Sequence, residues 1–587
     1  MGSLGDRKSG GNATDGNSPS PAFDINRIAV IGAGPSGLAS AKHLLAEGFS
    51  SSQIDIYEQQ AEVGGVWNYS ALTSSRSLRV PQTDAHADPD PPIYPEEPAE
   101  EEKDEYEDYV FDSDEEASTA PGSGACSLPA VSRKEKKPPI FPNPMYDDLY
   151  TNIPHTLMRY SDLGFTADGR GKGSHESCEI FPPRQVVQEY LLHYARDVRH
   201  LVRFSTQVAD VSLQTNASGE SSGEQPRIRD KWTVRSTNLL TDISRTETYD
   251  AVVVASGHYS APYIPSGMPG ISEFSTAHPD VISHSKTYRK ASAFAGKRVV
   301  LVGSGPSGLD IASQISGVCE SPLIISARSP IPEDMAAYLG VGDKVRVVGT
   351  IKQFLVEEKG IEVHSAPASS SQVVGETTER ILDVDAIIFC TGYLYTLPFI
   401  SASSLPSSTP PLITDGRRVH GIARHFIHTY HPTLVFPGLP IKIIPFPLAE
   451  AQAAVFSRLW TNRLPSPSHE ELQRWEREDE EGKGFEGTKV PGKSFHTFPK
   501  GGDARYINAL HDWALRARDE GGKKGKEPPF WGDEELWQRT IYAQAKIQFE
   551  KTGRTAKTLL ELGFRHERED TGDIERAKGE ERTDVAG

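Results

Sequence analysis

Two nearly identical glycine-rich stretches, GAGPSGL at residues 32–38 and GSGPSGLD at residues 303–310, constrain the fold more than any other feature of the chain. Each stretch follows a short apolar run and precedes an amphipathic one, so each predicts a strand, a tight turn and a helix. The three glycines of such a loop permit the turn, a close backbone approach to a pyrophosphate, and close packing of the helix on the strand. The chain is therefore predicted to hold two dinucleotides.

The strands that follow the two loops end differently. After the first loop, QIDIYE ends at Glu58, whose carboxylate can accept the hydroxyls of a ribose that carries no 2′-phosphate. After the second loop, IISARSP places Ser326 and Arg328 at the corresponding end. A cation there can pair with a 2′-phosphate, which favours NADPH over NADH. The pattern indicates a flavin site and a nicotinamide site; the alternative for Arg328 is a solvated surface side chain.

The acidic character of the chain is concentrated in one segment. The formal net charge is −19, and residues 84–116 hold 16 Asp and Glu against Lys103 alone, so the rest of the chain carries about −4. No basic stripe indicates nucleic acid binding. We expect residues 84–139 to form an acidic, disordered and solvated insert, with a regulatory tether as the alternative.

The chain shows no signal for a membrane or an oxidising compartment. No run approaches the roughly 18 apolar residues that cross a bilayer, and the polar N-terminus lacks the apolar core of a signal peptide. The four cysteines lie far apart and form no CxxC pair. These features predict a cytoplasmic protein without an integral membrane segment. Peripheral docking at the endoplasmic reticulum surface and a homodimer stay open.

Alternating strand and helix patterns predict an α/β fold with parallel sheets. We expect two Rossmann-like dinucleotide-binding domains and a helical C-terminal extension packed on the outside. The predicted divisions are a disordered tail at 1–23, an FAD-binding domain at 24–260 and 389–460, an NADPH-binding domain at 261–388, and the extension and tail at 461–587.

Several spaced motifs resemble those of the flavin-containing monooxygenases. They are GAGPSGL, Glu58, GGVW at 64–67, MYDDLYTNIP at 145–154, VVVASGHYSAPYIP, HSKTYR at 284–289, GSGPSGLDIA and FCTGY at 389–393. The match extends from about residue 25 to 460 with the acidic insert interrupting it, and PGKSFHTFPKGGDARYINALHDWA is similar to the fungal and yeast members. The resemblance implies a class B flavoprotein monooxygenase of the N,N-dimethylaniline monooxygenase type. It also implies nucleotide domains of the three-layer ββα type, with the NADPH domain inserted in the FAD domain.

This resemblance implies a reaction and a set of residues. NADPH would reduce FAD, dioxygen would give a flavin C4a-hydroperoxide, and one oxygen atom would pass to a soft nucleophilic N or S atom of a small molecule. It makes Asn152 the catalytic candidate beside the flavin, whereas residue chemistry alone equally allows a turn-stabilising role. The cofactor-binding candidates are Gly32, Gly34, Pro35, Ser36, Gly37, Glu58, Gly65, Val66, Trp67, Asn152, Gly303, Ser304, Gly305, Ser307, Gly308, Ser326, Arg328, Thr391 and Gly392.

One family hallmark, F-x-G-x-x-x-H-x-x-x-Y/F, is only half present. His278 and Asp280 stand at its Phe and Gly positions, and only His284 and Tyr288 fit. Baeyer–Villiger monooxygenases usually carry Trp followed by Pro or Asp at the last position, so Tyr288 followed by Arg289 argues against them.

Other functions are weighed against this one. His425, His428 and His431 are three residues apart, but Pro432 and the lack of nearby Asp, Glu or Cys partners argue against a metal site. The missing CxxC pair argues against a flavin disulfide reductase. An N-hydroxylase, a Baeyer–Villiger enzyme and a non-catalytic nucleotide-binding interaction protein stay open as alternatives.

Overall fold

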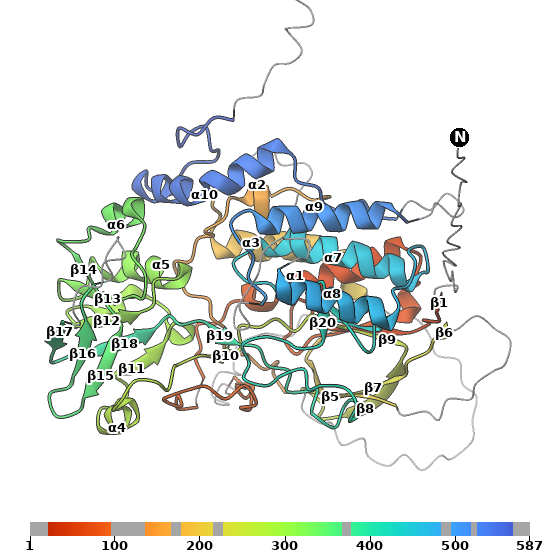
Figure 1. Cartoon of the computed structure of the whole chain (residues 1–587), viewed down its shortest axis with the longest axis horizontal. Helices are drawn as coiled ribbons and strands as arrows, with labels where there is room; N and C mark the ends of the chain where they lie inside the picture. The colour runs from red at the N-terminus through yellow and green to blue at the C-terminus, as the bar shows by residue number, and fades with distance from the viewer. Residues whose placement is uncertain are drawn as a thin grey trace, which may run out of the picture.

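The computed structural model describes residues 22–74, 76–95, 136–165, 178–214, 227–366, 377–482, 495–517 and 525–566. Two parallel sheets dominate these residues, one in each half of the molecule, with helices over the top (Figure 1). Each sheet carries one of the two glycine-rich loops, directly after an inner strand and before a helix, and the sequence predicted this strand, turn and helix.

The first sheet has the strand order β20-β21-β22-β9-β2-β3-β4. Its strands are β2 (Ile28–Ile31), β3 (Ile54–Tyr57), β4 (Val202–Arg203), β9 (Ala251–Val254), β20 (Ile422–Ala423), β21 (Ile427–His428) and β22 (Leu434–Val435). From β22 to β4 the neighbours run parallel, whereas β20 and β21 pair antiparallel at the edge. A sheet of this kind must be covered on both faces, because its inner strands β2 and β9 are apolar and buried throughout.

Alternate residues of β2 enter different cores. Ile28 and Val30 pack with α1 (Pro35–Ala46) and α7 (Pro445–Trp460). Ala29 and Ile31 pack instead with an antiparallel sheet, made of β5 (Thr206–Leu213), β7 (Trp232–Asn238) and β8 (Ser244–Tyr249). Successive strand side chains point to opposite faces, so this division gives the predicted three layers of sheet, sheet and helix.

The second sheet repeats the plan with the strand order β11-β18-β12-β13-β14, all parallel. Its strands are β11 (Ile282–His284), β12 (Val299–Val302), β13 (Leu323–Ser326), β14 (Val345–Val348) and β18 (Ala386–Phe389). On one face, Val300 and Ile324 pack against a small antiparallel sheet made of β15 (Ile351–Leu355), β16 (Gly360–His364) and β17 (Thr378–Ile381). On the other face, Leu301 and Ile325 pack against α5 (Pro306–Ile315). The other helices of this domain are α4 (Ile271–Ala277) and α6 (Glu333–Leu339).

The chain crosses between the two halves twice, and the two crossings pair with each other. β10 (Ala261–Pro262) and β19 (Tyr393–Leu394) form a short antiparallel ladder. Near these crossings, Ile93 and Ile140 exchange backbone hydrogen bonds, and Ala85 is buried. Residues 84–95 and 136–139, at the two ends of the predicted insert, are therefore part of the packed structure. The rest of the insert and the predicted N-terminal tail, except Ala22 and Phe23, lie outside the described residues.

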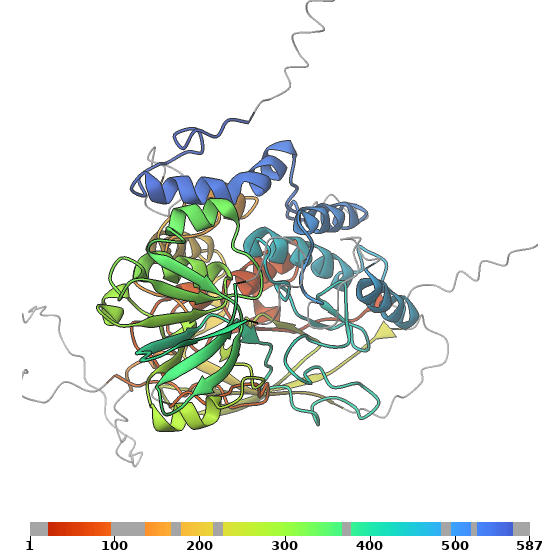
Figure 2. The ribbon, with the colours of Figure 1, turned by 60° about the vertical axis from the view of Figure 1, so that its left-hand side comes forward.

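The C-terminal extension is more deeply integrated than the sequence indicated. It contains α8 (His469–Glu481), α9 (Gly502–Leu515) and α10 (Asp533–Lys551). α9 packs on α7, and its residues Tyr506, Ile507 and Leu510 are fully buried. Figure 2 shows the blue helix α10 lying over α6 of the second domain, and α10 contacts both α6 and the short α2 (His155–Met158). The apolar face of α9 thus completes the first core, which the sequence did not indicate. Within the described residues, no helix has the length and apolar character needed to cross a membrane.

Candidate functional site

The first glycine loop has the backbone that a pyrophosphate site requires. Gly32 has a φ of +102°, and a Cβ at this position would lie 2.5 Å from the carbonyl oxygen of Ala255. A Cβ on Gly37 would collide with the carbonyl oxygen of Gly32. The next helix, α1, begins after Gly34 with no side-chain cap and no acidic residue in its first turn. Its free N–H groups and positive dipole end therefore suit a bound anion.

Glu58 lies at the end of β3, beside this loop, and is 4% exposed. Its carboxylate accepts the backbone N–H of Ala33 at 2.8 Å and that of Gln60 at 2.9 Å. Burial raises the pKa of Glu58 to about 7, and the backbone hydrogen bonds act in the opposite direction. Additional donors, such as ribose hydroxyls, would favour the charged carboxylate.

A cleft with a cavity volume of about 350 Å³ runs along the loop. The predicted residues that line it are Gly32, Gly34, Pro35, Ser36, Glu58, Gly65, Val66 and Trp67. The last three form a single 3₁₀ turn, η2 (Gly65–Trp67), and a Cβ on Gly34 would come within 3.5 Å of the Gly65 Cα. The space over Gly34 and the uncapped start of α1 fit the pyrophosphate of a dinucleotide. Gly37 instead serves the packing of α1 on the sheet.

The second glycine loop repeats this geometry in the other domain. Gly303 has a φ of +109°, and a Cβ there would lie 2.8 Å from the carbonyl oxygen of Cys390. A Cβ on Gly308 would collide with the Gly303 carbonyl oxygen, whereas one on Gly305 would meet no atom within 4 Å. The helix that follows, α5, also starts without a side-chain cap, and Ser304 and Ser307 flank Gly305 and Pro306. The open space over Gly305 fits a second pyrophosphate.

The two polar candidates downstream of the second loop differ in their surroundings. Ser326 is buried, and its hydroxyl donates to the carbonyl oxygen of Gly349 at 2.8 Å. Arg328 is exposed, and no hydrogen bond or ion pair of its side chain is found among the described residues. Arg328 is thus free to meet an anionic ligand, while Ser326 mainly fixes the end of β13.

Thr391 and Gly392 lie at the crossing between the domains and do not line the cleft. Gly392 accepts the backbone N–H of Tyr263 at 3.0 Å and lies 3.1 Å from the Nε2 atom of His284. The Thr391 hydroxyl donates to the carbonyl oxygen of Tyr263. These contacts hold β10 against β19, so both residues belong to the connection between the two nucleotide domains.

Asn152 is exposed and lines neither this cleft nor the larger cavity beside α10. The hydroxyl that bonds the local turn belongs to its neighbour, since Thr151 Oγ1 donates to the carbonyl oxygen of Ile153 at 2.9 Å. No hydrogen bond of the Asn152 side chain is found among the described residues, and the structure does not bring Asn152 to the wall of the cleft.

The incomplete hallmark has a structural role that its residues can still perform. Asp280 has a φ of +67°, the conformation for which glycine is suited and which Asp tolerates better than most residues. His278 packs on Phe274, and its Nε2 atom lies 2.7 Å from the carbonyl oxygen of Val356. His284 is fully buried, accepts the Lys286 N–H through Nδ1, and has its pKa lowered to about 3 by burial. Tyr288 donates to Gln314 at 2.9 Å.

Two charged residues of the cleft were not predicted from the sequence. Lys286, within the motif HSKTYR, lines the cleft and pairs with Asp90, which also lines it. The Lys286 ammonium also donates to the carbonyl oxygen of Ser260. The only sequence signal for Lys286 was its place between the hallmark positions His284 and Tyr288. Nothing in the sequence linked Lys286 to Asp90.

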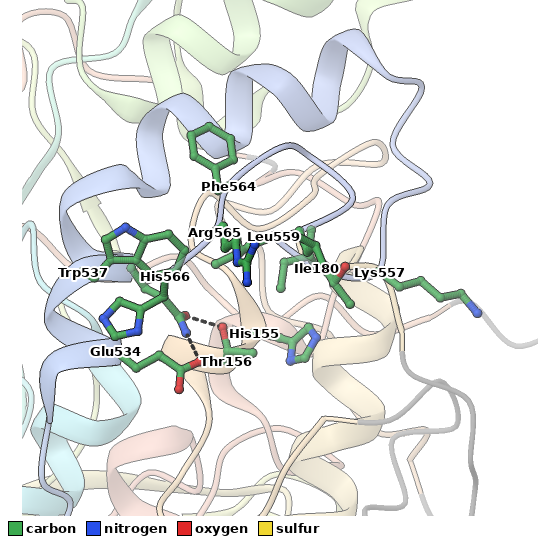
Figure 3. Close-up of a pocket in the computed structure, with 13 residues that line it drawn as sticks. His155, Thr156, Ile180, Glu534, Trp537, Lys557, Leu559, Phe564, Arg565 and His566 are labelled. Carbon is green, nitrogen blue, oxygen red and sulfur yellow. Dashed lines mark hydrogen bonds between the residues drawn. The ribbon is translucent and has the colours of Figure 1, made fainter. Parts of the chain in front are cut away.

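A second cavity of about 540 Å³ lies between α2, α10 and residues 557–566, and none of the predicted site residues lines it (Figure 3). Its polar wall is internally bonded: Thr156 donates to Gln538 at 2.6 Å, and Gln538 donates to Glu534 at 3.3 Å. Lys557 points away from the cavity. We assign this cavity no cofactor.

The three histidines weighed for a metal site do not form one. Their stretch folds as β21 and β22 rather than as a helix, and His425 packs against His496 whereas His428 stacks on His431. Among the described residues, no group of three His, Cys, Asp or Glu is placed to hold a metal ion.

Comparisons with known proteins agree with this geometry. The family described as flavin-binding monooxygenase-like matches residues 143–331, and an FAD-NAD(P)-binding family matches residues 29–134. The flavin-containing monooxygenase FMO GS-OX-like 2 of Arabidopsis thaliana is 28% identical over 527 residues, 88% of this chain and 90% of the relative. A thiol-specific monooxygenase of Saccharomyces cerevisiae is 25% identical over 498 residues, 83% of this chain and 85% of the relative.

The fold has a solved counterpart. The structure of an S-allyl-L-cysteine S-oxygenase from Allium sativum matches with a TM-score of 0.61 and 22% identity, covering 95% of this chain and 99% of that chain. At this identity the likeness concerns the fold, and it extends over both nucleotide domains and into the C-terminal extension.

Proposed function

We propose that this chain, which belongs to the flavin-binding monooxygenase-like family and uses FAD and NADPH, oxygenates soft nucleophilic sulfur or nitrogen atoms of small molecules. The observation that carries the proposal is the pair of glycine loops around Gly34 and Gly305, each before an uncapped helix and each in its own domain. Two nucleotide sites in one chain suit an enzyme that brings a hydride donor to a flavin.

Each part of the site has a distinct task in this proposal. Gly34 and the start of α1 hold the pyrophosphate of FAD, and Glu58 accepts its ribose hydroxyls. Gly305 and the start of α5 hold NADPH, with Arg328 on the 2′-phosphate. When bound, the two cofactors supply the redox and oxygen chemistry. Protein residues have to position them and exclude water.

Asn152 is kept as the proposed polar contact beside the reacting centre because of the resemblance of its motif MYDDLYTNIP to the family, although it lines neither cavity. A side-chain amide offers both a donor and an acceptor and does not titrate, so it can orient a neutral polar group at any physiological pH. A substrate that is already a good nucleophile needs no general base, and the proposal assigns none.

Sulfur is the first substrate class to test, because two of the similar proteins are named for sulfur oxygenation. Purified protein with FAD and NADPH should oxygenate an aryl methyl sulfide or a tertiary amine, with products identified by mass spectrometry. Turnover of a cyclic ketone alone would favour a Baeyer–Villiger enzyme. A protein that stays colourless after FAD addition would favour a non-catalytic role.

A variant that closes the flavin site serves as the matched control. Gly34→Val would fill the space between Gly34 and Gly65 while leaving the second domain intact. It should lose FAD and oxygenation together, whereas a contaminating activity would persist.

A further inference from the structure

Residues 495–498 of the C-terminal extension lie directly behind the cofactor cleft. The backbone N–H of Ile441 donates to the carbonyl oxygen of His496 at 2.8 Å, and Ile441 pairs with Thr497 in a parallel bridge. Ile441 lines the cleft, but no residue of 495–498 does. The segment therefore supports the cleft wall from outside.

The His496 ring holds a second part of the same wall. Its Nε2 atom accepts the backbone N–H of Val419 at 3.2 Å, and Val419 lines the cleft. Because a backbone N–H can only donate, Nε2 carries no proton, and the proton of the neutral ring lies on Nδ1. That atom lies 3.3 Å from the Nδ1 atom of His425 and donates to it. The hydrogen bonds thus fix both the tautomer and the orientation of the ring.

The His496 ring also packs against a third element of the wall. His496 and Tyr395 have ring centroids 5.1 Å apart, and Tyr395 and His258 have the same separation. The Tyr395 hydroxyl donates to the carbonyl oxygen of Leu439 at 2.7 Å. Tyr395, His258 and Leu439 all line the cleft. His496 is consequently the common support of segments that are far apart in the sequence.

A second link from the extension reaches the same wall independently. Gly438 donates its N–H to Gln452 at 2.8 Å, and Gln452 donates to the Tyr506 hydroxyl at 2.9 Å. Tyr506, in α9, donates in turn to the carbonyl oxygen of Arg424 at 2.5 Å. A Cβ on Gly438 would lie 2.6 Å from Ser36 Oγ, in the first turn of α1, so this link ends at the pyrophosphate loop.

We propose that His496 is a positioning residue for FAD, which orders the cleft wall at Val419, Tyr395 and Ile441 and so makes the C-terminal extension part of the flavin site. This inference rests on the proposed function, since it takes the cleft to be the flavin site. His496 contacts no cofactor itself; it acts through the residues that do.

Two similar-sized variants separate the proposed role from general stability. The amide oxygen of Gln reaches the place of Nε2 and can accept the Val419 N–H, whereas that of Asn is too short to do so. For His496→Asn we expect the Kd of the apoprotein for FAD to rise about tenfold, because a buried donor is left unsatisfied. For His496→Gln it should stay within about twofold of the wild type. FAD binding is measured by titration calorimetry well below the Tm of each variant.

Hydrogen exchange gives a readout without the cofactor. The amides of Val419, Gly438, Leu439 and Ile441 should exchange at least several-fold faster in His496→Asn than in His496→Gln. The control is His469→Phe in α8, which removes another histidine of the extension, one whose ring contacts Thr429 and Tyr430 away from the cleft. It should change neither FAD affinity nor exchange at the wall.

The outcomes are distinct. Wild-type protein that binds no FAD overturns the proposed function. If the wild type binds FAD and the Asn and Gln variants bind it equally well, only the inference about His496 is overturned. A His496→Asn variant with a lower Tm but an unchanged Kd for FAD likewise overturns that inference alone. If His496→Asn does not fold, Tyr506→Phe tests the second link, and an unchanged FAD affinity there overturns the role of the extension.

Discussion

Lys286 and Asp90 form an ion pair in the wall of the cofactor cleft, although 196 residues separate them in the sequence. Lys286 follows β11 in the second domain, and Asp90 lies near the start of the acidic segment. The side chains are 9% and 20% exposed, so solvent screens their attraction only weakly. The Lys286 ammonium also donates to Ser260 in the crossing before β10. The pair therefore joins the acidic segment, the crossing and the second domain.

Breaking this pair should destabilise the protein. Lys286→Met leaves Asp90 partly buried without its partner and should lower the free energy of unfolding by about 2–3 kcal/mol. A double-mutant cycle with Asp90→Asn should give a coupling of about 1–2 kcal/mol, measured by urea unfolding of the apoprotein. The exposed pair Arg79–Asp84, 3.5 Å apart, is the control and should give a coupling near zero. If the changes in unfolding free energy of the Lys286 and Asp90 variants are strictly additive, the two residues do not form a stabilising ion pair.

Glu58 should make the stability of the apoprotein depend on pH. Its pKa in the folded chain is about 7 against an ordinary value of 4.5, so between these values the folded chain keeps a proton that the unfolded chain has lost. The stabilisation is complete below about pH 4.5 and is lost as pH rises to about 7, roughly 3 kcal/mol in all. Glu58→Gln removes this dependence. Urea unfolding at pH 5 and pH 8 measures it, and parallel changes in wild type and variant would contradict it.

Binding of FAD should remove the proton from the Glu58 carboxyl group. Ribose hydroxyls donate to the charged carboxylate and lower its pKa, so binding near pH 6.5 should release up to about one proton in the wild type and less in Glu58→Gln. Calorimetric titrations in two buffers of different ionisation enthalpy measure the release.

The sequence predicted those parts of the site that depend on local backbone geometry. Gly32 and Gly303 have positive φ and stand against backbone carbonyl groups, so no other residue fits and the motif itself carries the information. The Lys286–Asp90 pair and the support from His496 depend on contacts between distant segments. Side chains of this kind carry no spacing pattern, which is why the sequence did not reveal them.

The structure also changes the meaning of the incomplete hallmark. Asp280 has a φ of +67° although it replaces glycine, so the backbone conformation is kept while the residue type is not. Asp280→Gly should therefore be neutral or stabilising by about 0.5–1 kcal/mol, whereas Asp280→Val should destabilise by about 1–2 kcal/mol. Thermal unfolding checks both. A loss of stability in Asp280→Gly would show that the aspartate side chain makes a needed contact.

Asn152 should affect how much product forms for each NADPH consumed, and not the stability of the fold. Asn152→Ser changes an exposed side chain, so the free energy of unfolding should stay within about 0.5 kcal/mol. The rate of NADPH-dependent flavin reduction should also be retained, while less product forms for each NADPH consumed. Thr151→Val, which removes the hydroxyl bonded to Ile153, is the contrasting variant and should lower stability by about 1 kcal/mol. An unchanged product-to-NADPH ratio in Asn152→Ser would exclude the proposed contact.

Arg328 should decide which nicotinamide cofactor the second site prefers. Its guanidinium is exposed and engages no partner within the described part of the chain, so its removal costs no internal contact. Only NADPH carries a 2′-phosphate for it to meet. Arg328→Ala should raise the Kd for NADPH by about 10- to 100-fold, corresponding to about 1–3 kcal/mol for a charge-assisted contact, and leave the Kd for NADH nearly unchanged. Arg346→Ala, at an exposed arginine paired with Glu379 in the same domain, should alter neither. If Arg328→Ala weakens the binding of NADPH and NADH equally, a residue other than Arg328 binds the 2′-phosphate.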